Sequence, residues 1–448
     1  MLLIDQYKRN LKIAYPVALS QLGHMAVGVA DSIMVGSLGG VALAGVTIGF
    51  SSFIPFMMLG IGISYGISPL IAKADGEKNP RDISSILKHA IVLNVLTGLI
   101  LCLGLYASSP MLTYLKQPEE VISLAIPFFK IMAISMVPLM IFQVFRQFAE
   151  GLALTRQAMI ISIIGNVINI ILNYLLIHGK FGFPQLGVNG AAYATLISRV
   201  VIAVAMFAFV FYYPRFKSYW AMFKEIKWSL SIFSHLLKMS LPVGVQLTLE
   251  AGAFGFAAIM VGWLGAKEIA AHHIALNMAA ITYMTATGIA SAATVRIGHE
   301  FGKKDYFAMR KAGIAAFHLA LVFMGCCALG FLAFRQYLPA LYIADVDIGA
   351  MATSLLLISA FFQLSDGVQV VGLGALRGIG DIRIPTAIAL ISYWLLGLPL
   401  GYFMAFPMGY GVEGIWYGLF CGLTIAACLL YARFTRKSKR LIVGIKNR

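Results

Sequence analysis

The stretch LLKMSLPVGVQLTLEAGAFGFAAIMVGWLG, residues 236–265, decides the fold. It exceeds the roughly 20 apolar residues that a helix needs to cross a bilayer. Near its middle it carries Glu250, with Gln246 one helical turn earlier on the same face. An ionised carboxylate at that depth costs roughly 2.5–3.5 kcal/mol, so a functional site is the default interpretation of such a residue. The stretch therefore predicts a membrane-spanning helix organised around an acid.

The composition extends this interpretation to the whole chain. Of 448 residues, 60% are hydrophobic and 12% are charged. A soluble domain carries about 25% charged residues, so the composition predicts an integral membrane protein. The runs are apolar on every face, which favours helices over the alternating strands of a barrel. We place twelve spans at residues 11–37, 42–72, 87–109, 121–147, 157–178, 188–213, 233–264, 268–296, 311–334, 348–375, 384–406 and 411–432.

The basic residues are distributed unevenly among the loops. Most lie at the N-terminus, at the C-terminus and in the loops that follow even-numbered spans, whereas the other loops hold Lys116, Lys180, Lys267 and Arg335. By the positive-inside rule, both termini are predicted to be cytoplasmic. The net charge of +16 is then explained by a cytoplasmic membrane face. No nucleic-acid partner is needed to account for it; the expected surroundings are a lipid bilayer.

An internal repeat organises the twelve spans. At an offset of 226 residues, Pro16-Val17 matches Pro242-Val243, and the Met-Val-Gly at 34–36 matches that at 260–262. The offset covers six spans, an even number, so both copies enter the membrane in the same direction and form a parallel repeat of two six-helix bundles. Such a duplication is typical of secondary transporters. We therefore predict an N-terminal lobe at 1–213, a cytoplasmic linker at 214–232, a C-terminal lobe at 233–435 and a basic cytoplasmic tail at 436–448.

Three acids within predicted spans are the candidate ion-coupling residues. Glu250 is one, and Asp366 is another, flanked by Gln363 and Gln369 at three-residue spacing. Asp31 is the third, and its counterpart in the repeat is Ala257. The two halves are thus expected to share a scaffold but not a site. A buried acid can hold a proton, or give its charge to Na⁺ or to a cationic substrate.

Further polar residues within spans are expected to support a cation or a substrate. They are Asn169, Asn173, Thr195, Gln246, Asn277, Tyr283 and Gln369. An aromatic ring such as that of Tyr283 can face a cation. The alternative for the amides is helix packing, because amide side chains also join helices in membranes. The in-span bases Lys130 and Arg199 are expected to snorkel or to pair.

Pro16 and Pro242 occupy equivalent positions and are predicted to bend the first helix of each lobe. The alternative is a proline near a helix start. The five cysteines form no Cys-x-x-Cys pair, and no metal-ligand cluster, phosphate-binding loop or nucleophile–base set is present in the sequence. We therefore expect no enzymatic activity, no bound metal and no cofactor.

Two longer motifs point to a known family. These are residues 187–195, GVNGAAYAT, and residues 366–378, DGVQVVGLGALRG, together with Pro16 fifteen residues before Asp31. With the duplicated six-span architecture, they resemble the multidrug and toxic compound extrusion (MATE) family, and Glu250 with Asp366 resembles its NorM-like branch. The resemblance implies efflux of organic cations in exchange for Na⁺ or H⁺.

The same resemblance implies roles for individual residues. Glu250 and Asp366 match a C-lobe cation site, and Asp31 matches an N-lobe acid with Asn169, Asn173 and Thr195 near it. Tyr283 resembles an aromatic residue near the substrate cavity, and Asp345 with Asp347 resembles acids of an outer loop. Some members carry an acid where this chain has Asn173, and others a tyrosine where it has Phe362. Na⁺ and H⁺ therefore both remain open as the coupling ion.

The expected function is secondary active multidrug efflux by alternating access in the cytoplasmic (inner) membrane of a bacterium. The partners would be cationic amphipathic small molecules, and nothing in the sequence requires more than a monomer. One alternative is a flippase for lipid-linked oligosaccharide, whose cavity would need many Arg and Lys residues to neutralise pyrophosphate. Mid-span acids outnumber mid-span bases in this chain, which favours cationic cargo. A passive channel is a further alternative.

Overall fold

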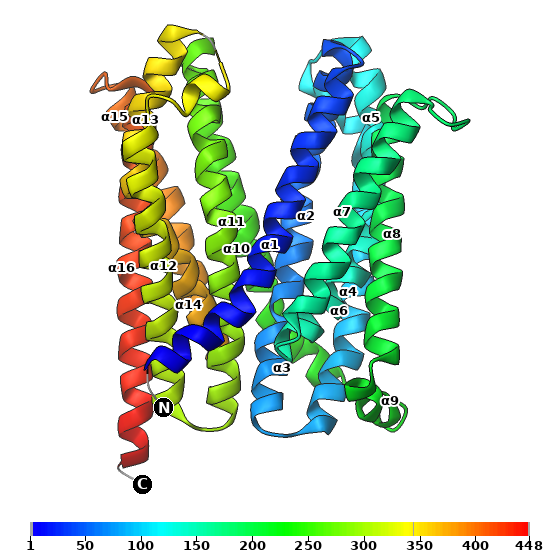
Figure 1. Ribbon diagram of the computed structural model, residues 1–448, viewed down its shortest axis with the longest axis vertical. Helices are drawn as coiled ribbons and strands as arrows, with labels where there is room; N and C mark the ends of the chain where they lie inside the picture. The colour runs from blue at the N-terminus through cyan, green and yellow to red at the C-terminus, as the bar shows by residue number, and fades with distance from the viewer. Residues whose placement is uncertain (1–2, 344, 447–448) are drawn as a thin grey trace. The chain divides into compact units, whose positions relative to one another are not determined.

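The computed structural model describes residues 3–343 and 345–446, and within these ranges the chain forms helices, turns and loops without a strand. Twelve helices or helix pairs are long and apolar enough to cross a membrane, which confirms the predicted all-α membrane class. The elements in chain order, shown in Figure 1, are α1 (Leu3–Gly36), α2 (Gly40–Tyr65), α3 (Ile67–Gly76), α4 (Pro80–Ser108), η1 (Ser109–Leu115), α5 (Glu119–Ile134), α6 (Met136–Gly151), α7 (Thr155–His178), α8 (Val188–Tyr212), η2 (Pro214–Phe216), α9 (Lys217–Phe223), α10 (Leu230–Gly262), α11 (Ala266–Gly302), α12 (Tyr306–Phe334), η3 (Pro339–Leu341), α13 (Val346–Gly378), α14 (Arg383–Leu390), η4 (Ile391–Gly397), α15 (Leu398–Ala405) and α16 (Gly411–Lys446).

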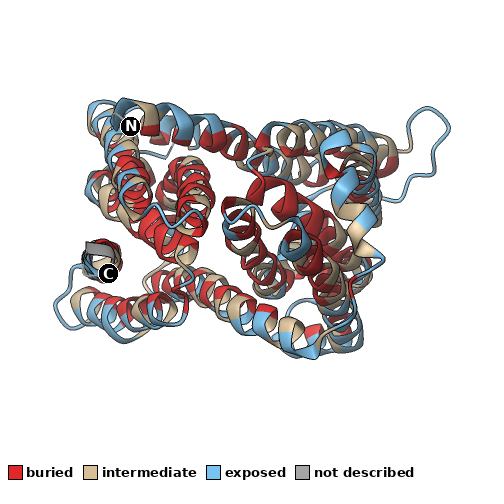
Figure 2. Cartoon of the chain, turned by 90° about the horizontal axis from the view of Figure 1, so that it is seen from below, coloured by how far each residue is buried: buried red, intermediate tan, exposed pale blue. Residues whose placement is uncertain are grey.

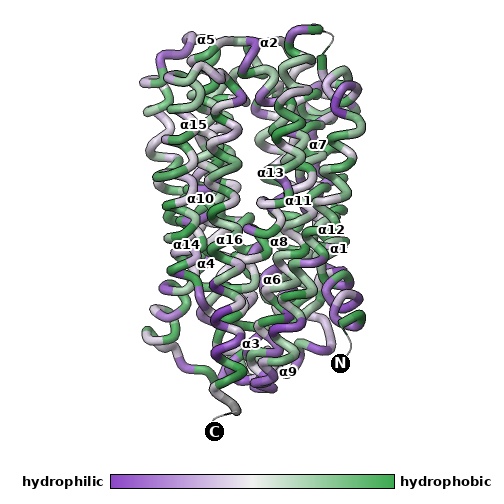
Figure 3. Tube along the Cα trace, turned by 90° about the vertical axis from the view of Figure 1, so that its left-hand side faces the viewer, coloured by the Kyte–Doolittle hydropathy of each residue, from purple (hydrophilic) through white to green (hydrophobic). Residues whose placement is uncertain are grey.

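Apolar side chains cover the middle of the helices and leave the polar ones near their ends. In Figure 3 the central part of the trace is largely green, and purple segments gather toward its ends. In Figure 2, buried positions in red tend to lie on one side of a helix and exposed positions in pale blue on the other. The exposed positions include many large apolar residues, such as Ile33, Leu103 and Val322. An apolar exterior of this kind fits lipid as the solvent.

The chain divides into two compact units, and each is described by itself. The N-unit comprises Leu19–Gly244, and the C-unit comprises Met1–Ala18 together with Val245–Arg448. The boundaries between the units therefore fall inside α1 and α10, not in loops. Pro16 and Pro242 lie two residues before these boundaries, inside continuous helices. A proline inside a helix removes one backbone hydrogen bond and permits a bend, which suits a helix that changes unit.

Specific polar contacts hold the first half of α1 in the C-unit. Asn10 donates a hydrogen bond to the Ala312 carbonyl of α12 at 3.0 Å. Arg296 of α11 donates from Nη2 to Gln6 Oε1 at 2.6 Å. Both Asn10 and Gln6 are fully buried, so these bonds form away from solvent. They place the start of the chain among helices that follow it by about 290 residues.

Close glycine contacts join the same segments of helix in both units. A Cβ built on Gly288 of α11 would lie 2.8 Å from the backbone nitrogen of Ala18 in α1. A Cβ built on Gly62 of α2 would lie 2.8 Å from the Val243 carbonyl in α10. Gly62 and Gly288 are related by the repeat offset of 226 residues. The first helix of each repeat thus packs its first half on the second helix of the other repeat.

The predicted linker is held on α4 by hydrogen bonds to the backbone. Lys88 donates from Nζ to the carbonyls of Phe223 and Ile226, at 3.2 and 2.7 Å. His89 Nε2 accepts the Ser229 N–H at 3.0 Å, just before α10 begins. Lys88 therefore pairs carbonyls at the C-terminal end of α9, which attract cations.

The last helix continues through the segment that the sequence analysis assigned to a tail. α16 runs to Lys446, so residue 436 lies inside a helix. Asp381, in the turn between α13 and α14, accepts hydrogen bonds from Arg433 Nε at 2.7 Å and Nη2 at 3.1 Å. Lys437 Nζ lies 2.9 Å from the same carboxylate. This ion-pair cluster fixes the lower part of α16 to the rest of the C-unit.

We expect Gly288→Ala to lower the melting temperature of the detergent-purified protein. The new methyl group would meet backbone atoms of α1, and overpacking of this kind costs about 1–3 kcal/mol. Gly325→Ala is the matched control, because a Cβ built on Gly325 of α12 meets nothing within 4 Å. Alanine is the better helix former, so the control should be neutral or slightly stabilising. Equal melting temperatures for the two variants would contradict the close packing of α1 on α11.

We expect the anchor of α16 to weaken on acidification. Burial raises the pKa of Asp381, but the hydrogen bonds from Arg433 and Lys437 outweigh it and lower that pKa below its ordinary value near 3.8. The stabilisation is therefore present above the ordinary pKa and is lost as the pH falls through the lowered one. Asp381→Asn mimics the protonated form at neutral pH. It should increase tryptic cleavage after residues 436–440, and unchanged cleavage would exclude the anchor.

Candidate functional site

The two acids of the C-unit lie on neighbouring helices in its interior. Glu250 of α10 is 7% exposed and Asp366 of α13 is 4% exposed. Gln369, also on α13, donates from Nε2 to Glu250 Oε1 at 3.5 Å. The two carboxylates are close enough to interact electrostatically. Among the described residues, neither carboxylate forms an ion pair within 4.0 Å, so the burial of these acids is not compensated by a base.

Several polar atoms around these acids have no hydrogen-bond partner among the described residues. They are Glu250 Oε2, Gln369 Oε1, Gln246 Nε2 and both amide atoms of Gln363. Gln363 and Gln369 are fully buried. Buried polar groups are otherwise almost always hydrogen-bonded, and exceptions occur where water or an ion binds. Oxygen atoms from carboxylates and amides are also suitable ligands for a hard cation. The residues present therefore fit a proton, Na⁺ or a cationic ligand.

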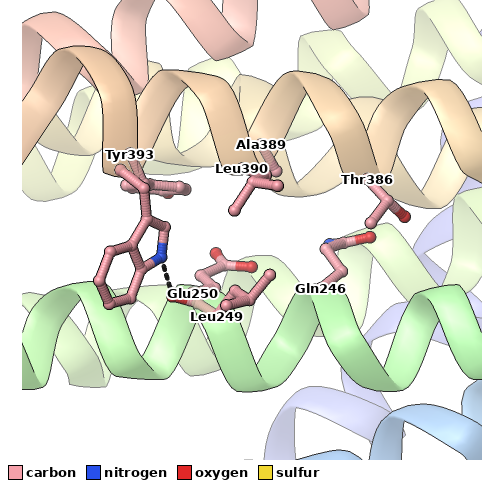
Figure 4. A pocket seen from close by; sticks show the side chains of 8 residues that line it. Gln246, Leu249, Glu250, Thr386, Ala389, Leu390 and Tyr393 are labelled. Carbon is pink, nitrogen blue, oxygen red and sulfur yellow. Dashed lines mark hydrogen bonds between the residues drawn. The ribbon is translucent and has the colours of Figure 1, made fainter.

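A pocket opens beside Glu250 between two segments of helix, as Figure 4 shows. One wall is α10 with Gln246, Leu249 and Glu250, and the other is α14 and η4. The second wall contributes Thr386, Ala389, Leu390, Tyr393 and Trp394. Trp394 Nε1 donates to the Leu249 carbonyl at 2.9 Å, the bond drawn in Figure 4, and thereby joins the two walls.

Tyr393 is a pocket residue that the sequence analysis missed. It is 1% exposed, and its hydroxyl has no hydrogen-bond partner among the described residues. It lies in η4, a stretch of π-helix that covers Ile391–Gly397. π-Turns are rare and often occur at functional sites. In the sequence, Tyr393 lies in an apolar run without any polar spacing, so no pattern singled it out.

Glycines on α16 allow this second wall to pack closely. Gly418 lies against the backbone of Gly397 and Gly401, and Gly422 lies against the Ser392 carbonyl. Two helices can approach this closely only where side chains are absent, as in the small-xxx-small pattern of membrane helices. The sequence carries that pattern at 414, 418 and 422, and it was the available signal for this contact. The glycine face of α16 thus holds η4 and its Tyr393 in place.

The N-unit brings its predicted polar residues into one network. Asn173 of α7 donates from Nδ2 to Asp31 of α1 and, at 3.0 Å, to Asn169. Asn169 in turn donates to Thr195 Oγ1 at 3.5 Å and to Ser198 Oγ at 3.3 Å, both on α8. Three helices therefore meet around Asp31. Ser198 was not singled out by the sequence analysis, although it lies one turn after Thr195.

The remaining predicted residues lie apart from these two centres or have other contacts. Asn277 of α11 is exposed, and Tyr283 is half-buried and interacts electrostatically with Tyr393. Asp345 caps α13 by accepting the N–H groups of Asp347 and Ile348 at 2.9 and 3.1 Å. Asp347 is exposed and pairs with Lys267 at 2.5 Å. The two outer-loop acids thus have structural partners at the ends of α13 and α11.

Comparisons with known proteins agree over nearly the whole chain. The MatE family model matches residues 16–175 and again residues 242–403, which repeats the 226-residue offset. A probable multidrug resistance protein NorM of Bacillus cereus is 32% identical over 441 residues, which cover 98% of this chain and 97% of that protein. A protein of the same name from Rhodopseudomonas palustris is 34% identical over 434 residues, covering 96% and 92%.

Solved structures share the fold at lower sequence identity. A crystal structure of MATE in the straight conformation has a TM-score of 0.90 at 21% identity and covers 97% of each chain. An outward-facing conformation of a multidrug resistance MATE family transporter of the MOP superfamily has a TM-score of 0.89 at 20% identity, covering 97% of this chain and 96% of that one. These likenesses show the fold.

We expect Trp394→Phe to lower the thermal stability of the purified protein. The substitution keeps an aromatic ring but removes the donor to Leu249, and a lost hydrogen bond of this kind costs about 0.5–1.5 kcal/mol. Trp263→Phe is the control, because Trp263 is 58% exposed on α10. Melting in detergent should show a lower temperature for the Trp394 variant only. If both variants melt like the unmodified protein, Trp394 does not join the two walls.

Proposed function

The chain belongs to the MatE family, and on that basis we propose that it is a secondary active transporter that exports organic cations in exchange for Na⁺ or H⁺. The relatives reported above carry the name of a multidrug resistance protein over almost their full length. The twelve membrane-crossing helices of this chain agree with transport as a multi-pass membrane protein. The comparisons give no support to the flippase alternative.

The observation that carries the proposal is the uncompensated acid pair of the C-unit. Glu250 and Asp366 are both buried and lie on adjacent helices without an ion pair. The other buried acids, Glu150 and Glu300, do form ion pairs, with Arg146 at 2.7 Å and Arg296 at 3.3 Å. The acid pair can therefore exchange one cation for another, because no fixed base occupies it.

The coupling follows from competition at these carboxylates. In the proposed cycle, Na⁺ or H⁺ from outside neutralises the pair and displaces the cargo, and its release inside prepares the pair for the next cargo. A ligand shifts a conformational equilibrium only through different affinities for the two states. Alternating access therefore requires that Glu250 and Asp366 load differently in each state. The membrane potential contributes about 2.3 kcal/mol per charge per 100 mV to this cycle.

The surrounding residues would position the acids. Gln369 donates to Glu250, and Gln246 lies one turn earlier on α10 in the same pocket. Trp394 fixes the backbone beside Glu250, and Tyr393 brings a hydroxyl to the opposite wall. Amide oxygens of Gln363 and Gln369 would complete the oxygen ligands of a bound ion. In the N-unit, Asp31 with Asn173 and Asn169 is a second centre of the same proposed function.

The cargo and the location follow from charge. Mid-span acids outnumber mid-span bases, which favours cationic amphipathic molecules. The uneven loop charges support a bacterial cytoplasmic membrane with both termini on the cytoplasmic side. We propose a monomer as the transporting unit, since each of the two centres is built within one unit of a single chain. We propose that the chain carries out transport without enzymatic chemistry.

We expect Glu250→Gln and Asp366→Asn each to abolish efflux of ethidium from cells while the protein is still made. Each change removes a charge that the cycle needs but keeps the shape of the side chain. Glu120→Gln is the control, because Glu120 is exposed in the first turn of α5. Fluorescence of accumulated ethidium gives the efflux rate, and immunoblotting gives the amount of protein. Efflux at the unmodified rate by both pair variants would overturn the proposal.

The coupling ion is identified by imposing one gradient at a time. Purified protein in lipid vesicles should move ethidium against its gradient when either a Na⁺ gradient or a pH gradient is imposed alone. Movement with only one of them names the ion, whereas equal movement without any gradient would favour a passive channel.

A further inference from the structure

Arg199 lies too deep in the membrane to reach its surface. It is the twelfth residue of α8, which has 25 residues, so it stands about 16 Å from one end and about 20 Å from the other at 1.5 Å per residue. Snorkelling brings a basic group to the interface only from near a helix end. Arg199 must therefore be satisfied within the protein. A base at this depth is by default a functional hypothesis, with its partner to be named.

The direct contacts of Arg199 are all with neutral groups. Nη1 donates to Ser135 Oγ at 2.6 Å, and Nη2 lies 3.6 Å from Met57 Sδ. The guanidinium carbon is 5.6 Å from the centre of the Phe53 ring. Ser135 lies at the break between α5 and α6. These contacts orient the guanidinium, but none of them neutralises its charge.

Asp31 is the acid of the N-unit that remains for Arg199. The buried Glu150 is bound by Arg146 Nε at 2.7 Å and by Gln147 at 3.3 Å. Asp31 has no ion pair within 4.0 Å among the described residues, yet it and Arg199 interact electrostatically. An unpaired acid and an unpaired base in one unit attract each other over several ångströms in a low dielectric.

A continuous set of hydrogen bonds connects the positions of the two charges. Asn173 donates to Asp31, and Asn169 accepts from Asn173 and donates to Thr195. Thr195 lies one turn before Arg199 on α8, so both face the same side of the helix. The network fixes α1 against α8 and holds acid and base in a constant relation.

The C-unit has no equivalent base within its acid pair. Arg296 is paired with Glu300 at 3.3 Å. Arg377 acts electrostatically on Glu250, but it lies in the last turn of α13, about 16 Å along the helix from Asp366. The two units therefore treat their acids differently, one with a base nearby in the membrane core and the other without.

We propose that Arg199 is a built-in counter-charge for Asp31, which competes with external cations for that carboxylate and leaves cation loading to Glu250 and Asp366. When a cation or proton occupies Asp31, Arg199 is held by Ser135; when Asp31 is free, the guanidinium compensates it. The inference rests on the proposed function and assigns the coupling to one unit. Arg199 is thus a positioning residue, which acts through Asp31.

The test is a double-mutant cycle read by equilibrium binding, which needs no transport. Ethidium binding to the purified, lipid-reconstituted protein is measured by fluorescence anisotropy for the unmodified protein, Arg199→Met, Asp31→Asn and the double variant. Removing the competing charge should tighten binding by Arg199→Met roughly tenfold. Adding Asp31→Asn should abolish that gain, because the carboxylate is the group set free. Arg199→Lys keeps the charge and should bind like the unmodified protein.

Controls separate charge from folding and from the proposed function. Lys130→Met removes the other in-span base of the N-unit, which lies 5.4 Å from the Tyr106 ring, and should leave binding unchanged. Melting temperatures identify a variant that fails to fold, and Arg199→Gln then replaces Arg199→Met. Unchanged binding by the Arg199 variant, or a gain that persists in the double variant, overturns the counter-charge. Loss of gradient-driven ethidium transport in the unmodified protein would instead overturn the proposed function.

Discussion

The cost of charge in hydrocarbon is the constraint on which the interior of this protein depends. Each ionisable group in a span must be paired, must reach water or must be used by the protein. Arg146 with Glu150 and Arg296 with Glu300 meet this requirement as ion pairs one turn apart on their own helices. Asp31, Glu250, Asp366 and Arg199 do not, and all four lie deeper in their spans. The same physical rule therefore separates structural charges from functional ones.

The repeat supplies a scaffold, and the charges are added to it differently in each half. Gly62 and Gly288 make equivalent close contacts 226 residues apart, because two helices that touch backbone to backbone tolerate no side chain there. Acids are under no such steric requirement, and Glu250 has His24 as its counterpart in the first repeat. Two units of similar packing can thus carry one acid with a base nearby and one acid pair without a base.

Much of the fold could be predicted from the sequence because hydrocarbon imposes simple rules. Twelve apolar runs, a parallel repeat and three intramembrane acids were all visible as composition and spacing, and the grouping of Asn169, Asn173 and Thr195 agrees with the polar network around Asp31. Tyr393 could not be found, since its role depends on the π-turn of η4 and on the glycine face of α16. Nor could the capping by Asp345, because a loop carries no periodicity.

The exchange of helix halves bears on how the chain is assembled during synthesis. Residues 3–18 leave the ribosome before any other part, yet their packing partners lie in α11 and α12, nearly 300 residues later. The N-unit likewise remains incomplete until residue 244 has been made. Neither half of the gene product can therefore finish folding as an independent intermediate. The earliest segment must wait in the bilayer, and the late arrival of its partners makes maturation of the two units a single event.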